Sequence, residues 1–242
     1  MDDFVELKNF SKIYSKGKEK ITGCKNVNLK AQRGKVTGLL GLNGAGKSTI
    51  LKALAGLHYA SEGSVSVFGN DDNAFIRSVS GYVPEFPQSD PSLTVEETLI
   101  FEGQLYNLGE NQIKENVENA IKLFDLDTVR FQKVSTLSKG YLQRTVFAKV
   151  LSFDPQVLIL DEFSTGLDPA QIVSMKKTIK TLAKDKVVIL STHHIDEASA
   201  LCDYIYIISK GSVAAEGTIE EILSLTKKNN LEDAFISLTK KD

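Results

Sequence analysis

The stretch Gly41-Leu42-Asn43-Gly44-Ala45-Gly46-Lys47-Ser48 decides the fold of this chain. It matches the pattern G-x-x-x-x-G-K-[ST], which forms a loop that wraps around phosphate groups. The near-continuous apolar run 36–40 precedes it, as expected of a strand that is covered on both faces. Aliphatic residues at helical spacing follow and predict a helix over residues 48–57. The stretch therefore predicts a strand, a phosphate-binding turn and a helix in direct succession.

The residue types in this loop suit an anionic ligand. Gly44 and Gly46 have no Cβ, so the backbone amides can come close to a phosphate group. The following helix points its N-terminus at the same group, and its dipole favours negative charge. Lys47 would reach the β- and γ-phosphates of a nucleotide, and the Ser48 hydroxyl would coordinate Mg²⁺. The alternative is a glycine-rich turn with an exposed lysine, but the flanking strand and helix favour the phosphate loop.

A second candidate site follows the apolar run 157–160, which ends in Asp161-Glu162. Ligands gather at the carboxyl ends of the strands in a parallel sheet. We therefore expect Asp161 to face the Mg²⁺ through water, and Glu162 to orient and polarise an attacking water near the γ-phosphate. Taken alone, the same residues could be a solvated strand end, so this interpretation depends on the phosphate loop.

Composition limits the class of protein. Hydrophobic residues make up 42% of the 242 residues and charged residues 25%, which excludes wholesale disorder, collagen and a small disulfide scaffold. The 29 basic and 31 acidic residues nearly balance, so no nucleic-acid partner is expected. No apolar run approaches the ~20 residues that span a bilayer, and the acidic start lacks a secretory leader. We expect an intracellular chain.

The residues that could hold a disulfide or a transition metal are few. Cys24 and Cys202 lie far apart without C-x-x-C spacing, and they are expected to be small buried or half-buried thiols. The histidines, His58, His193 and His194, are too few and badly spaced for a metal cluster. Neither a disulfide nor a zinc site is therefore expected.

Strand and helix patterns alternate along most of the chain, which predicts an α/β fold with a largely parallel sheet. Val5 and Leu7 alternate with polar residues and predict an edge strand. Between residues 86 and 149, helical patterns replace strand patterns and predict an inserted helical lobe. We expect a single domain over residues 1–242, with an α/β core at 1–85 and 150–217, the lobe at 86–149 and a C-terminal helical tail at 218–242.

Further motifs stand in a fixed order around the two candidate sites. Together with the phosphate loop they resemble the motifs of the ATP-binding cassette (ABC) ATPases, the nucleotide-binding subunits of ABC transporters, over nearly the whole chain. The matching segments are the adenine-stacking aromatic Tyr14, the Q-loop Gly81-Tyr82-Val83-Pro84-Glu85, the signature Leu137-Ser138-Lys139-Gly140-Tyr141, the D-loop Ser164-Thr165-Gly166-Leu167-Asp168-Pro169 and the switch histidine in Ser191-Thr192-His193.

The resemblance implies a fold and a set of site residues. The fold is a RecA-like P-loop core with a mostly parallel sheet, an N-terminal antiparallel β subdomain and the inserted helical lobe. The cofactors are ATP and Mg²⁺. The resemblance implies that Glu162 and His193 are catalytic and that Ser48, Asp161 and Glu85 hold the metal. It implies that Ser138, Lys139 and Gly140 contact the ATP of a partner cassette and that Asp168 lies in the dimer interface. The residues that it implies for nucleotide binding are Gly41, Leu42, Asn43, Gly44, Ala45, Gly46, Lys47, Ser48, Thr49 and Tyr14.

The resemblance also implies partners. ATP-dependent dimerisation of two cassettes, as a homodimer or a heterodimer, would drive an integral membrane permease from the cytoplasmic face of the cell membrane. The tail 231–235 is similar to that of export subunits with a separate permease, so export is favoured. The alternative is a soluble ABC-type ATPase that acts on a ribosome or another macromolecular complex, but such proteins usually carry two cassettes or a long coiled coil.

Three positions depart from the family pattern. Glu85 replaces the usual glutamine of the Q-loop and adds a charge where glutamine is a neutral ligand. Lys139 replaces a glycine of the signature and places a cation where the γ-phosphate of the partner's nucleotide is expected; it either assists closure or is simply solvated. Phe163 replaces the usual proline after Glu162.

Overall fold

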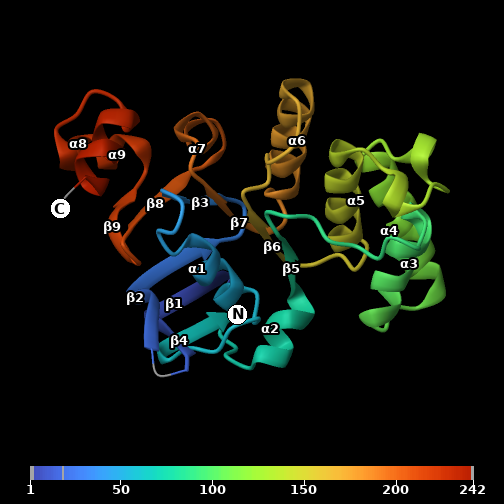
Figure 1. Cartoon of the computed structure of the whole chain (residues 1–242), viewed down its shortest axis with the longest axis horizontal. Coiled ribbons are helices and arrows are strands. Elements are labelled where there is room, and N and C mark those ends of the chain that lie inside the picture. The colour runs from blue at the N-terminus through green and yellow to red at the C-terminus, as the bar shows by residue number, and fades with distance from the viewer. Residues whose placement is uncertain (1–2, 18, 241–242) are drawn as a thin grey trace.

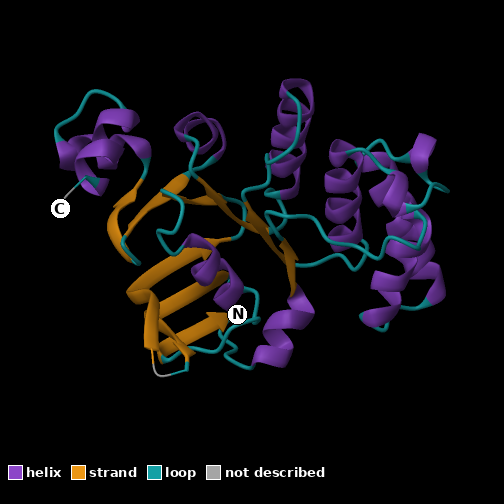
Figure 2. Cartoon of the chain, in the orientation of Figure 1, coloured by secondary structure: helices purple, strands orange, loops and turns teal. Residues whose placement is uncertain are grey.

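A computed structural model describes residues 3–17 and 19–240. Figure 1 shows two sheets in the middle of the molecule, with helices packed around them. In Figure 2 the helices of the lobe stand at one end, and the C-terminal helices stand at the other. The fold is therefore α/β with an antiparallel subdomain and a mostly parallel main sheet, as predicted.

The main sheet carries the candidate sites at the carboxyl ends of its strands. All neighbouring strands in it are parallel, except that the last pair is antiparallel. The order across the sheet is β5 (Ser80–Val83), β6 (Val157–Asp161), β7 (Val187–Thr192), β3 (Val36–Gly41), β8 (Tyr204–Ser209) and β9 (Ser212–Gly217).

The second sheet is antiparallel and has the order β2 (Glu19–Gln32), β1 (Phe4–Lys16), β4 (Glu62–Val67). The prediction of an edge strand near the N-terminus is wrong, because β1 is the middle strand. Val5 pairs with Ala31 on one side and with Val67 on the other. Val67 is the only buried residue of β4, so the sequence carries little hydrophobic alternation to announce this strand.

The central strands bury both faces, and alternate residues enter different cores. In β6, Val157 and Ile159 pack with the antiparallel sheet and with helix α1 (Lys47–Leu54). Leu158 and Leu160 point the other way and pack with the lobe and with helix α6 (Pro169–Leu182). Each fully buried aliphatic side chain stabilises the fold by about 1.5–3 kcal/mol relative to exposure. This two-sided burial holds the carboxyl end of β6 in place.

Helix α1 is shorter than the pattern predicts. The predicted range is 48–57, whereas the helix begins at Lys47 and ends at Leu54. Gly56, with φ of 69°, follows in a turn that stops the helix. The helix is packed between the two sheets in Figure 1, and its N-terminus faces the phosphate loop.

The helical lobe consists of α3 (Val95–Leu105), α4 (Glu110–Leu123) and α5 (Lys139–Leu151), with short 3₁₀ turns at Asp127–Val129 and Val134–Thr136. Thr94 accepts a hydrogen bond from the Glu97 amide and Glu97 accepts one from the Thr94 amide, which makes a capping box. The remaining helices are α2 (Asn73–Val79), α7 (Ile195–Leu201), α8 (Ile219–Thr226) and α9 (Leu231–Thr239).

The two cysteines are shielded from solvent to different degrees. Cys24 is buried and Cys202 is half-buried, as expected, and both are free thiols. Burial raises the pKa of Cys24 to about 11.

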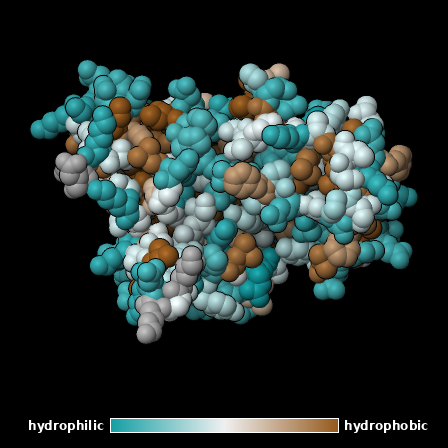
Figure 3. All heavy atoms as spheres, in the orientation of Figure 1, coloured by the Kyte–Doolittle hydropathy of each residue, from teal (hydrophilic) through white to brown (hydrophobic). Residues whose placement is uncertain are grey.

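Among the residues described, none of the helices is long and apolar enough to cross a bilayer. On the face drawn in Figure 3, apolar residues are interspersed with hydrophilic ones.

Candidate functional site

The phosphate loop connects β3 to α1 through two glycines in the left-handed region. Gly44 has φ of 78° and Gly46, which caps the helix, has φ of 106°. A Cβ on Gly46 would lie 2.7 Å from the carbonyl oxygen of Gly23, so space as well as conformation requires glycine here. The amides at the start of α1 are therefore open toward the space in front of the loop.

A cavity of about 500 Å³ opens in front of the loop. Its volume and its ring of backbone amides suit a polar, anionic ligand. The loop forms one wall and the β1–β2 hairpin the other. The lining residues are Tyr14, Ile21, Thr22, Gly23, residues 43–49, Glu85 and Glu162.

Lys47 is buried and its ammonium group is fully engaged. Its Nζ donates to the carbonyl oxygens of Gly41 at 2.8 Å and Leu42 at 3.2 Å. It also lies 3.0 Å from Oε1 of Glu162. The side chain thus joins the two segments that the sequence singled out, the phosphate loop and the end of β6. Because Lys47 also lines the cavity, a phosphate group there would compete with these partners for the ammonium group.

Glu162 follows β6 with a strained backbone. Its φ is 48°, a left-handed conformation that is uncommon for a residue with a Cβ. The Glu162 amide donates to Ser191 Oγ at 3.1 Å, which holds this turn against β7. The carboxylate is buried, and its Oε2 is 2.8 Å from Nδ1 of His193. Oε1 has no hydrogen-bond partner among the described residues besides its ion pair with Lys47.

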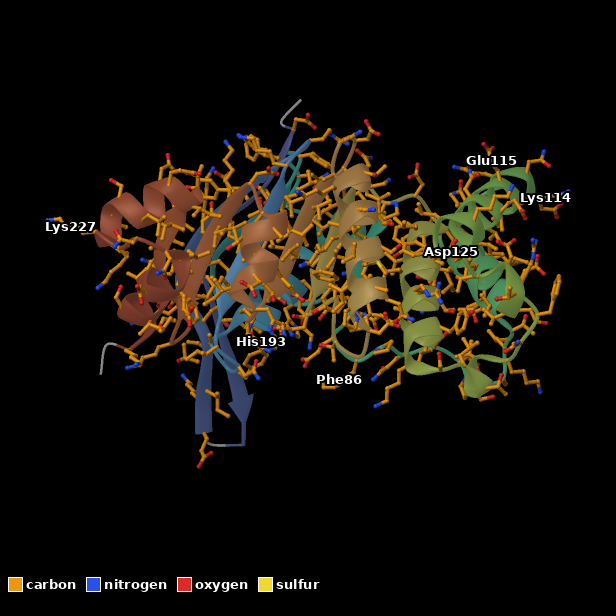
Figure 4. The ribbon with its side chains drawn as sticks, turned by 90° about the horizontal axis from the view of Figure 1, so that it is seen from above. Phe86, Lys114, Glu115, Asp125, His193 and Lys227 are labelled. Atoms are coloured by element: carbon orange, nitrogen blue, oxygen red, sulfur yellow. The ribbon has the colours of Figure 1, made fainter. Side chains whose placement is uncertain are left out.

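His193 comes after β7 and reaches Glu162 from the solvent side. Its side chain is 37% exposed. Figure 4 shows His193 at the same edge of the molecule as Phe86, which follows the Q-loop. His194 is exposed, and its ring lies 4.0 Å from that of His193, centroid to centroid. Only His193 of the two therefore contacts the candidate catalytic carboxylate.

Asp161 is buried and held by two hydroxyl groups. Tyr82 donates to Oδ2 at 2.9 Å, and Ser191 donates to Oδ1 at 2.5 Å. Burial raises the pKa of Tyr82 above its usual range, and the neighbouring charges of Asp161 and Glu85 add to the effect. The phenol therefore stays a proton donor to Asp161. Tyr82 and Ser191 lie inside motifs that the sequence identified, but their role as partners of Asp161 needed the structure.

The oxygen donors near the loop fit Mg²⁺ only together with a phosphate. The described residues contain no group of three or more His, Cys, Asp or Glu side chains that could hold a metal. Mg²⁺ is usually bound through one or two carboxylates plus waters and substrate phosphates. Ser48 and Glu85 line the cavity, and Asp161 is adjacent to Glu162. This hard-oxygen set suits Mg²⁺ that arrives with a nucleotide.

Tyr14 reaches the cavity from the β1–β2 hairpin. Its hydroxyl is 3.2 Å from Oγ1 of Thr49, and its ring packs edge-on against His58. The hairpin also brings Ile21, Thr22 and Gly23 to the cavity, which the sequence analysis missed. Tyr14 pairs with Ile21 in the β1–β2 register, so an expected hairpin would have been the signal for them.

The signature residues lie elsewhere, at the N-terminus of α5. Ser138 caps the helix and accepts a hydrogen bond from the Tyr141 amide at 3.4 Å. Ser138 and Lys139 are exposed, whereas Gly140 is buried against the Gln171 side chain. None of these residues lines the cavity of its own chain. A single chain therefore does not bring the signature and the phosphate loop together.

Asp168 and Phe163 have clear structural roles within the chain. Asp168 caps α6 and accepts a hydrogen bond from the Gln171 amide at 2.9 Å. Phe163 is completely buried in the core between β6 and the lobe, which accounts for an apolar residue at this position. Its carbonyl oxygen accepts a hydrogen bond from Nε2 of Gln143 at 3.2 Å.

Comparisons with known proteins agree with one another. Residues 24–165 match the family described as ABC transporter. The chain is 30% identical over 238 residues to the ABC transporter ATP-binding protein NatA of Bacillus subtilis (strain 168), covering 96% of this chain and 97% of that one. It is 36% identical over 189 residues to the Nod factor export ATP-binding protein I of Rhizobium sp. (strain N33), covering 76% of this chain and 62% of that one.

A solved structure supports the same assignment. The dimeric structure of a post-hydrolysis state of the ATP-binding cassette MJ0796, bound to ADP and Pi, superposes with a TM-score of 0.82 at 27% sequence identity. The match covers 88% of this chain and 98% of that chain. The sequence comparisons and the fold comparison therefore support the same family, and the cavity suited to an anionic ligand agrees with that family.

Proposed function

The chain belongs to the ABC transporter family and is an ATP-binding, ATP-hydrolysing cassette, and from this premise we propose that two cassettes close over ATP to drive a separate integral membrane permease. The observation that carries the ATP site in this proposal is that Lys47 and Glu162 lie 3.0 Å apart in front of the phosphate loop. This contact brings a phosphate-binding cation and a buried carboxylate to the same wall of one cavity.

The phosphate loop holds the nucleotide in this proposal. The amides of residues 41–49 surround the phosphates, and Lys47 turns from its carbonyl partners toward the β- and γ-phosphates. The aromatic ring of Tyr14 stacks on adenine. Ser48, Asp161 and Glu85 would hold Mg²⁺, which would neutralise charge on the phosphates when bound.

Glu162 and His193 carry the hydrolytic step. Once Lys47 turns to the phosphates, the Glu162 carboxylate is free to orient a water and to accept its proton. His193 contacts the second oxygen of Glu162 at 2.8 Å, and in this proposal it also contacts the γ-phosphate. The hydrogen bond between the Glu162 amide and Ser191 fixes the position of the Glu162 carboxylate during this proton transfer.

Two copies are needed because the signature of a single chain is remote from its own cavity. Ser138, Lys139 and Gly140 of one copy close over the ATP of the other, with Asp168 near the interface. The partner is a second copy of this chain or a sibling cassette. The dimeric state of the similar cassette MJ0796 supports the arrangement. Loss of the γ-phosphate then removes contacts across the interface and lets the copies separate.

The permease is expected to bind the helical lobe. A groove of about 290 Å³ between α3 and α4 is lined by Ile100, Ile113 and Val117 together with polar and charged residues, and Phe101, which follows Ile100 on α3, is 52% exposed. A helix with apolar anchors would fit such a groove. The chain would then be peripheral, on the cytoplasmic face of the membrane. The export name of the Rhizobium relative supports export over import, and the transporter name of the Bacillus relative together with that export name favours the permease over a ribosomal complex.

Affinity purification from the cells that make the protein tests this function. The tagged full chain is recovered from detergent-solubilised membranes, and its partners are identified by mass spectrometry. We expect an integral membrane subunit to co-purify. Phe101→Glu should reduce its recovery without affecting ATP binding. Leu225→Glu, which puts the same charge on the exposed apolar residue of α8, should not reduce it. Recovery in ribosomal fractions alone would contradict the proposal.

A further inference from the structure

Lys139 is a cation that the described part of its own chain leaves without a partner. It is the first residue of α5 and is exposed. Within residues 3–17 and 19–240 its ammonium group makes no hydrogen bond or ion pair, whereas those of Lys47, Lys149 and Lys186 pair with carboxylates. A positive charge in the first turn is unfavourable beside the positive end of the helix dipole. An anion from outside the chain would relieve this cost.

The cavity in front of the phosphate loop has the opposite imbalance. Glu85 and Glu162 line it, and Asp161 is buried next to it. Among the residues that the structure describes, the only basic one that lines it is Lys47, and its ammonium group is already paired with Glu162. A triphosphate brings further negative charge, and the Mg²⁺ proposed to bind with it would offset only part of the total. Glu85 therefore adds a carboxylate at a place where the described chain supplies no second cation.

Lys139 does not complete the cavity of its own copy. It is not among the residues that line that cavity. Figure 1 shows α5 in the lobe, with β6 and β7 between it and α1. The excess cation and the excess carboxylates of one chain thus lie in different parts of the molecule. A second copy in head-to-tail orientation is needed to bring them together.

We propose that Lys139 of one copy pairs with Glu85 of the other copy across the bound triphosphate. This rests on the proposed function, in which the signature of one copy closes over the cavity of the other. Lys139 acts as a positioning residue: it offsets the charge that Glu85 adds and so favours the closed dimer. The two departures from the family pattern, Lys139 and Glu85, then compensate each other, because either one alone would weaken the closed dimer.

A double-mutant cycle on dimer formation tests the pairing. The full chain carries Glu162→Gln so that ATP persists, and sedimentation velocity with Mg²⁺ and ATP gives the dimer dissociation constant. Lys139→Gln should raise that constant about tenfold when Glu85 is present, and less than about threefold when Glu85→Gln is also present. Lys139→Arg should retain dimerisation. Lys114→Gln removes the same charge from α4, on the outer side of the lobe in Figure 4, and should change nothing.

Salt and nucleotide binding give independent readouts. Dimerisation of the chain that keeps Lys139 should weaken with ionic strength more steeply than that of the Lys139→Gln chain. Binding of ATP to the monomer should be equal in both, because the lysine acts on the other copy. An equal effect of Lys139→Gln with Glu85 in place and with the Glu85→Gln substitution would overturn the pairing alone. Failure of the Glu162→Gln chain itself to dimerise with ATP would overturn the proposed function and the pairing with it.

Discussion

The phosphate-loop cavity and the signature turn differ in how much of each is complete within one chain. In the cavity, Lys47 and Glu162 are buried and paired, and Asp161 has two hydroxyl donors. At the signature turn, Ser138 and Lys139 are exposed, and the only side-chain hydrogen bond that Ser138 makes within the described residues caps its own helix. One region is preorganised by contacts between distant segments, and the other presents exposed groups whose only side-chain hydrogen bond among the described residues is a helix cap.

This difference indicates which properties belong to a single copy and which belong to a pair. Substitutions of the cavity residues that bind the nucleotide should alter ATP affinity even in dilute monomer. Substitutions in the signature turn should leave the ATP affinity of the monomer unchanged and weaken only the pair of copies. A nucleotide-binding variant with the ATP affinity of the parent, or a signature variant whose monomer loses ATP affinity, would break the comparison.

The largest effect is expected from Glu162→Gln. The amide keeps the shape of the side chain but cannot accept the proton of the attacking water. Turnover should fall about 100- to 10,000-fold, the usual contribution of a general base. ATP binding should persist, so ATP-bound dimers should accumulate, as size-exclusion chromatography with light scattering would show. Unchanged turnover would remove Glu162 from the role given to it.

Lys47→Ala should act on binding before it acts on chemistry. The variant loses charge-assisted hydrogen bonds to phosphate, which are worth about 1.5–3 kcal/mol each, so ATP affinity should fall at least about tenfold. Isothermal titration calorimetry on the monomer measures this. Lys52→Ala, on the same helix but away from the loop, is the control. Normal affinity of the Lys47 variant would argue against the phosphate-loop assignment.

Ser138→Ala tests the signature turn. ATP affinity of the monomer should stay unchanged, whereas dimer formation should weaken about threefold to tenfold because a hydroxyl donor to phosphate is lost. The substitution also removes the cap of α5. Ser138→Asn is therefore measured beside it, since asparagine retains the cap. A dimer as tight as that of the parent would put the arrangement across two copies in doubt.

Asp168 separates a structural role from an interfacial one. Asp168→Ala removes the cap of α6 and should lower the melting temperature of the monomer by about 2–4 °C. Asp168→Asn keeps the cap and removes the charge. If Asp168 also stabilises the dimer interface, the asparagine variant should have the parent's melting temperature and a weaker dimer. Parent-like dimerisation of that variant would leave capping as the role of Asp168.

The smallest effect is expected at Tyr14. Tyr14→Phe loses the hydrogen bond to Thr49 and keeps the ring, so ATP affinity should change by less than about threefold. Tyr14→Ala loses the stacking surface and should bind ATP more weakly than the phenylalanine variant. Competition between ATP and GTP for the site tests the same contact, because the two nucleotides differ in their base. Equal affinities for the two variants would exclude stacking on the base.

The strands and loops with strong local patterns could be predicted from the sequence. The runs 36–40 and 157–160 are apolar throughout because both faces of these strands are buried, and the glycines after the first run mark the phosphate loop. The strand at Glu62–Val67 and the short strand Ser80–Val83 were missed. Their polar and glycine residues carry little periodicity, and they exist because neighbouring strands supply their hydrogen bonds.

Residue order alone determined the parallel core, the phosphate loop and the acidic strand end, because local backbone chemistry and the spacing of apolar residues specify them. Only the tertiary structure decided that Lys47 pairs with Glu162, that Tyr82 and Ser191 hold Asp161, and that β1 lies in the middle of its sheet. These contacts join segments far apart in the chain, and no local pattern encodes which side chains meet when separate strands end at the same edge of a sheet.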